Sequence, residues 1–119
     1  MRYDLYFWRE DQPIEAAADS LLQRLAADRN PPGIDRLSLS DIKDTFRHHF
    51  PDIAVGDYDL VSEASGGSFR VSFSFDELNR PTSICVSSQD PLVENPDVFN
   101  RIFAAVREVG CTRIESAIR

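Results

Sequence analysis

Alternation of apolar and polar residues along several short stretches predicts that much of this chain forms β-strands. The clearest stretch is residues 68–75, SFRVSFSF, in which every second residue is apolar. This period predicts a strand with one buried face and one face in water. Residues 2–9 are apolar at both odd and even positions, which is typical of a central strand. Trp8 in this stretch is therefore expected to be a core residue.

Turn residues separate the later predicted strands. The pair Gly66-Gly67 is typical of a hairpin turn, and Asn79-Arg80-Pro81 predicts a second turn. Short turns between successive strands produce an antiparallel meander. The strands predicted after the first are residues 57–63, 68–75 and 82–88, with residues 111–118 as a possible short final strand.

Three other stretches have apolar residues every three or four positions, which predicts amphipathic helices. The first begins at Pro13, because proline is tolerated at the first helical position, and ends at residues 30–33, NPPG. In the second, Ser40 is the expected N-cap and Pro51 stops the helix. This second helix places apolar residues every four positions, which gives it one buried face.

The third predicted helix follows Asn95, the expected N-cap, and continues to about residue 109, where Gly110 favours its end. The order is then strand, helix, helix, three strands, helix and a possible last strand. Helices at the ends and a meander in the middle predict an α+β fold, in which helices pack on one face of an antiparallel sheet of about four to five strands. A chain of 119 residues suits one domain, so residues 1–119 are expected to form a single domain.

Negative charge is concentrated in one part of the sequence. The net charge is −7, and residues 51–63 contribute −4 of it through Asp52, Asp57, Asp59 and Glu63 with no basic residue. An acidic chain is a poor partner for nucleic acid, since phosphate binding depends on clustered Lys and Arg. The same reasoning disfavours an anionic membrane surface. A basic protein is the remaining class of charged partner.

No stretch approaches the roughly 20 apolar residues of a membrane span. The apolar run at the N-terminus is too short for a secretory signal and is followed by Arg9-Glu10-Asp11. The sequence therefore indicates a cytoplasmic protein.

The sequence contains no recognisable catalytic, cofactor-binding or metal-binding motif. His48-His49 lies at the end of a predicted helix, where adjacent side chains point in different directions and a cationic His suits the helix dipole. Cys85 and Cys111 have no metal-ligand spacing and are expected to be buried thiols rather than a disulfide. The sequence thus predicts that the protein is not an enzyme and carries no cofactor and no metal.

The acidic stretch has two interpretations. Asp57 and Asp59 would lie on the same face of the strand predicted at residues 57–63, and this face is either a solvated surface or a recognition surface for a basic protein. Tyr58, between them, is expected to be exposed and to act as an aromatic anchor. The candidate partner-binding residues are Asp52, Asp57, Tyr58, Asp59 and Glu63.

Residues 3–8, YDLYFW, resemble the start of a group of small bacterial proteins. Further matches follow in the same order at residues 39–42 (LSDI), Phe50-Pro51 and residues 67–71 (GSFRV), so the resemblance covers about residues 1–75. Residues 111–115, CTRIE, depart from the pattern. These proteins are similar to immunity proteins of bacterial polymorphic toxin systems, such as the Rhs, contact-dependent inhibition and type VI secretion systems. The motif is structural and implies no catalytic residue.

This resemblance implies that the chain binds a cognate toxin domain, which would be basic, and neutralises it by protein–protein interaction. Two other classes of function stay open at this point. One is a small ligand-binding or enzymatic α+β domain with a pocket between helices and sheet. The other is an accessory subunit unrelated to toxins.

Overall fold

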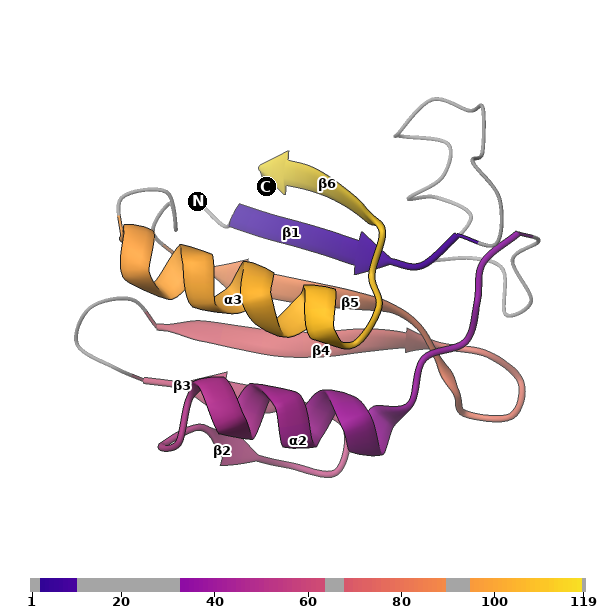
Figure 1. The fold of residues 1–119 in the computed structure, drawn as a ribbon, viewed down its shortest axis with the longest axis horizontal. Helices are drawn as coiled ribbons and strands as arrows, with labels where there is room; N and C mark the ends of the chain where they lie inside the picture. The colour runs from indigo at the N-terminus through magenta and orange to yellow at the C-terminus, as the bar shows by residue number, and fades with distance from the viewer. Residues whose placement is uncertain (1–2, 11–32, 64–67, 90–94, 119) are drawn as a thin grey trace.

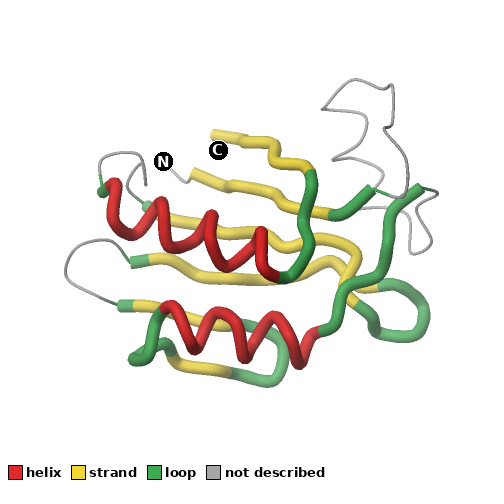
Figure 2. The backbone as a smooth tube through the Cα atoms, in the orientation of Figure 1, coloured by secondary structure: helices red, strands yellow, loops and turns green. Residues whose placement is uncertain are grey.

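Six antiparallel strands form one sheet in the computed structural model, which describes residues 3–10, 33–63, 68–89 and 95–118. Their order across the sheet is β2-β3-β4-β5-β1-β6 (Figures 1 and 2). This confirms the α+β class, with more strands than the four to five predicted. The strands are β1 (Tyr3–Trp8), β2 (Ala54–Val55), β3 (Leu60–Ser62), β4 (Phe69–Phe75), β5 (Pro81–Ser88) and β6 (Arg113–Ile118).

Two helices, α2 (Leu39–His49) and α3 (Pro96–Glu108), pack side by side on one face of this sheet (Figure 1). They run in opposite directions, as Figure 1 shows. Asn95 caps α3, and Gly110 follows it with a φ of 96°, a left-handed conformation that favours glycine; both agree with the prediction. The first predicted helix and the Gly66-Gly67 turn lie outside the described residues.

The main hydrophobic core lies between the helices and the sheet. Strand register explains its composition, because directly opposed residues of an antiparallel pair point to the same face. Phe7 is opposite Ile84, and Val71 is opposite Val86. The Phe7 ring also meets the ring of Phe103 on α3 edge to face, with centroids 5.8 Å apart. The buried members of this core include Phe7, Ile42, Phe46, Leu60, Phe69, Val71, Ile84, Val86, Ile102, Ala105 and Val106.

β1 is a central strand, as predicted, because it lies between β5 and β6. Trp8 is fully buried, also as predicted. Since neighbouring residues of a strand alternate between faces, Trp8 lies on the sheet face opposite Phe7 and the two helices. There its indole N–H donates to the Glu10 carboxylate at 3.1 Å, and the Arg113 guanidinium lies 5.7 Å from the ring centroid.

The N-cap of α2 is Ser38, so the prediction of Ser40 is wrong. The Ser38 hydroxyl accepts a hydrogen bond from the backbone N–H of Asp41 at 3.3 Å, and the helix begins at Leu39. Ser40 lies within the first turn and is exposed. Both serines precede the same apolar pattern, and backbone conformation selects the one whose φ and ψ are extended.

The strand predicted at residues 57–63 is also corrected. Its second half forms β3, but residues 56–59 form a turn that joins β3 to the two-residue strand β2. The backbone N–H of Gly56 donates to the carbonyl of Asp59 at 2.8 Å and closes this turn. Gly and Asp favour turns, and in GDYD this preference outweighs the short period-two pattern. Asp57 and Asp59 therefore lie in a turn and not on the face of a strand.

Candidate functional site

The five candidate residues all lie on the hairpin of β2 and β3, hereafter the acidic hairpin (residues 52–63), at one edge of the sheet. Asp57, Tyr58 and Asp59 form its turn. Asp52 precedes β2 and Glu63 follows β3, so these two carboxylates lie together at the other end of the hairpin. Asp59 and Glu63 are four positions apart along nearly extended chain, which corresponds to about 13 Å. The acids therefore form two pairs along one edge rather than a single cluster.

Tyr58 is the exposed aromatic residue of the turn, as predicted, with 62% of its surface accessible. One side of its ring is supported by Phe75 at the end of β4, with ring centroids 5.5 Å apart and planes at 84°. Phe75 in turn contacts Phe73, with centroids 5.9 Å apart. An exposed ring that is held on one side keeps its orientation, which lowers the entropy cost of contacting a partner. The sequence offered no signal for Phe75 in this role.

Cationic side chains of α2 and β4 contact the turn of the acidic hairpin. The Lys43 ammonium on α2 donates to the backbone carbonyl of Asp57 at 2.9 Å and holds the backbone of the turn, while Asp57 itself is exposed. The Arg70 guanidinium on β4 lies 4.0 Å from the Asp59 carboxylate, and both side chains are exposed. An exposed ion pair of this length is weak. Among the described residues, the Asp57 carboxylate takes part in no ion pair.

At the other end of the hairpin, Asp52 and Glu63 line a hollow of about 390 Å³ together with Phe50 and Arg101. Arg101 belongs to α3, but its guanidinium is directed to the end of α2. It lies 4.3 Å from the Phe50 ring centroid, and its Nε donates to the His49 carbonyl at 3.0 Å. In the described part of the chain no ion pair involves Asp52 or Glu63.

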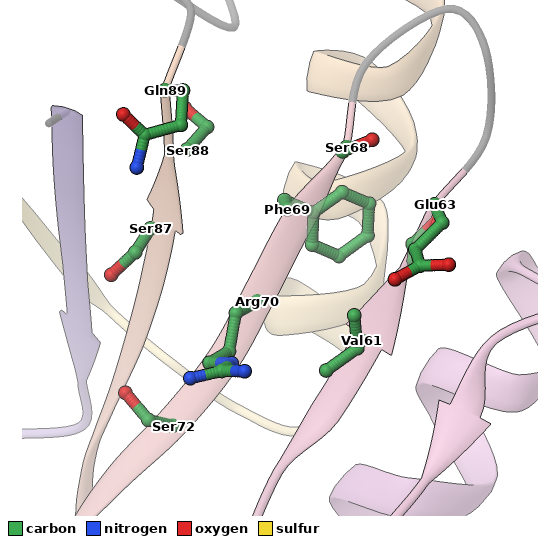
Figure 3. A pocket seen from close by; sticks show the side chains of 10 residues that line it. Val61, Glu63, Ser68, Phe69, Arg70, Ser72, Ser87, Ser88 and Gln89 are labelled. Atoms are coloured by element: carbon green, nitrogen blue, oxygen red, sulfur yellow. The ribbon is translucent and has the colours of Figure 1, made fainter.

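A second hollow, of about 690 Å³, lies on the sheet face away from the helices (Figure 3). Figure 3 shows Arg70 on β4 between Val61 of β3 and Ser87 of β5. The lining is mostly polar and includes several serines, whereas sites for small molecules are mostly apolar and enclosed. Glu63 lines both hollows and connects them to the acidic hairpin.

Several acids outside the hairpin are neutralised by arginines. Arg9 pairs with Asp35 at 3.0 Å, and Arg113 pairs with Glu10 at 2.9 Å. The hydrogen bond that the Arg113 guanidinium donates to Glu10 raises the pKa of Arg113 further. The acids of the acidic hairpin form fewer ion pairs than these acids, so more of their negative charge is uncompensated.

Asp76, in the turn between β4 and β5, is the most strongly neutralised of these acids. Arg36 and Arg80 each approach its carboxylate to 2.8 Å. Burial raises the pKa of Asp76, but hydrogen bonds from the backbone of Arg80, the Arg36 side chain and the backbone of Leu78 outweigh burial and lower it to about 2. This carboxylate organises a turn rather than a ligand site.

The other candidate chemistry has structural explanations. His49 lies at the end of α2, as predicted, with its Nε2 2.9 Å from a Glu108 carboxylate oxygen on α3. Cys85 and Cys111 are free, as predicted, but partly rather than fully buried. Burial raises the pKa of Cys85 and raises that of Cys111 to about 12, the opposite of what a reactive thiolate requires. Within the described ranges no three His, Cys, Asp or Glu side chains gather as a metal-binding group.

Comparison of the chain with protein-family models, with curated proteins and with solved structures found no match. Neither of the two described helices is long and apolar enough to span a lipid bilayer.

Proposed function

We propose that this chain is an immunity protein of a bacterial polymorphic toxin system, which binds a cognate toxin domain through the acidic hairpin and neutralises it in the cytoplasm. One observation carries the proposal: Tyr58 is held by Phe75 and exposed between two carboxylates. Among the described residues, no ion pair involves Asp52, Asp57 or Glu63. Like charges that are not paired repel each other. A cationic partner that binds this surface removes the repulsion, so binding of such a partner is favoured.

The expected partner surface is basic. Domains that act on nucleic acids or nucleotides need cationic clefts, and a row of carboxylates can occupy such a cleft in place of phosphates. Opposite charges also accelerate encounter, up to about 10⁸ M⁻¹s⁻¹ or more at low salt. The ring of Tyr58 would add a contact of the type that dominates binding energy at protein interfaces.

The direct test begins with the gene immediately upstream, which on this proposal encodes a large protein that ends in a toxin domain. We expect expression of that domain to stop growth and co-expression of this protein to restore it. The purified pair should form a complex whose dissociation constant rises with salt, as measured by calorimetry at two or more ionic strengths.

Growth arrest that this protein does not relieve would contradict the proposal, as would a complex that is insensitive to salt. A thermal-shift screen of small metabolites without protein partners is the matched control. A stabilisation of several degrees by one metabolite would favour the alternative of a ligand-binding domain.

A further inference from the structure

The two edges of the sheet differ in length. β2, at the edge formed by the acidic hairpin, has two residues, whereas β6, at the opposite edge, has six. β6 pairs with β1 on one side, and no described strand pairs with its other side. A long edge strand presents unpaired backbone N–H and C=O groups that can add a further strand.

β6 lacks several features that block strand addition, and its two charged residues, Arg113 and Glu115, pair with each other in its own chain. Its sequence, RIESAI, contains no Pro, Gly or Lys, and its ladder with β1 runs over six consecutive residue pairs without a register shift. Among the described residues, three large apolar side chains are exposed: Tyr58, Leu78 and Ile114. Ile114 is 39% exposed. Ile114 is the member of that group that lies within an edge strand.

The sequence of β6 is also complementary to itself. When two copies pair antiparallel about a two-fold axis through Ile114, Ile114 faces Ile114 of the second copy on one face of the sheet. On the other face, Arg113 lies opposite Glu115 of the second copy, and Glu115 lies opposite Arg113 of the second copy. Opposite charges directly across an antiparallel pair stabilise it, and such a pairing is isologous, as a closed dimer requires.

We propose that β6 binds the β6 strand of a second copy of this chain in this register, in which Arg113, Ile114 and Glu115 of each copy pair, so that two six-stranded sheets form one continuous sheet. Arg113 already lies 3.3 Å from Glu115 and 2.9 Å from Glu10 in its own chain. Glu115 of the second copy extends that network, and the two Ile114 side chains cover each other. The acidic hairpins then lie at the two outer edges of the joined sheet, so the dimer forms independently of toxin binding.

The paired segment is short, so the dimer is expected to be weak and to increase with concentration. Sedimentation velocity on the full chain, from about 1 μM to about 1 mM, should show a monomer–dimer equilibrium. Ile114→Lys places two ammonium groups against each other at the axis and should give a monomer at every concentration. Ile114→Ser is the milder variant if the lysine chain does not fold, and circular dichroism monitors folding in both.

Cysteine cross-linking tests the register. Opposed residues of an antiparallel pair have Cα atoms about 4.5–5.5 Å apart, which suits a disulfide. Ile114→Cys should therefore form an intermolecular disulfide under mild oxidation, identified by peptide mass spectrometry. The matched control Ser116→Cys should not, because its two copies would lie about 13 Å apart along the strands. A monomer at all concentrations, or a cross-link through position 116 and not 114, would overturn the proposal.

Discussion

The ring of Tyr58 meets the ring of Phe75 edge to face, with centroids 5.5 Å apart and planes at 84°. This contact joins the turn of the acidic hairpin to the end of β4, 17 residues further along the chain. It orients an exposed aromatic side chain between Asp57 and Asp59.

Truncation of Tyr58 should weaken binding to the toxin domain far more than it lowers stability. Tyr58→Ala removes an exposed anchor, so we expect the dissociation constant to rise about 10- to 100-fold. The loss of its contact with Phe75 should cost about 0.5–1.5 kcal/mol in the free energy of unfolding. Calorimetry and urea unfolding measure the two effects. Leu78→Ala removes another exposed apolar side chain, 72% accessible, and should leave affinity unchanged if the hairpin is the interface.

Charge reversal in the hairpin turn should weaken binding and reduce its dependence on salt. For Asp57→Lys/Asp59→Lys we expect at least about a tenfold increase in the dissociation constant, mainly through slower association. The double variant Glu77→Lys/Asp97→Lys changes net charge equally at exposed acids outside the hairpin. Surface plasmon resonance at several salt concentrations compares the two. Equal effects of both variants would show that overall charge, and not the hairpin, determines the affinity.

Removal of the N-cap of α2 should destabilise the fold, and the effect should come from Ser38 and not from Ser40. Ser38→Ala removes the acceptor for the Asp41 N–H, which should cost about 1 kcal/mol. Ser40→Ala, within the first turn and exposed, should change stability by less than about 0.5 kcal/mol. Urea unfolding followed by circular dichroism measures both. A larger effect at Ser40 would show that the helix begins later than Leu39.

Removal of a core ring on α2 should be the most destabilising of these changes. Phe46 is fully buried and stacks with Phe50, with centroids 6.3 Å apart. Phe46→Ala leaves a cavity between α2 and the sheet and should cost about 3–5 kcal/mol. Asp44→Ala, on the exposed side of the same helix, should change stability by less than about 0.5 kcal/mol. Thermal unfolding of the two variants provides the comparison.

The turn at Asp76 should give the protein part of its acid sensitivity. The pKa of Asp76 is lowered from its usual 3.8 to about 2, so the ionised carboxylate stabilises the folded state above about pH 4. This stabilisation is lost as pH falls from 4 toward 2. Asp76→Asn should therefore be less stable than the parent at neutral pH, with a difference that shrinks below pH 4. The control Glu77→Gln changes an exposed neighbour, and its stability should follow that of the parent at every pH. A difference in stability between Asp76→Asn and the parent that does not change with pH would contradict this explanation.

Local sequence patterns were sufficient for most of the fold. The alternation in residues 68–75 predicted β4, although only Phe69 and Val71 are fully buried while Phe73 and Phe75 are partly exposed. Caps and stops such as Asn95 and Gly110 predicted the bounds of α3. These features depend on residues within one or two turns of each other, so an amino-acid sequence is enough to recognise them.

The amino-acid sequence alone places the negative charge in residues 51–63 and predicts an exposed Tyr58 among these acids. The arrangement of these acids, in contrast, depends on contacts between distant parts of the fold. The turn at residues 56–59 depends on a close approach of Gly56 to Asp59, and its placement depends on Lys43 of α2 and Phe75 of β4. The pairing of acids elsewhere with arginines up to 103 residues away likewise decided where charge stays uncompensated. Such contacts join segments that are distant along the chain, and no local pattern encodes them.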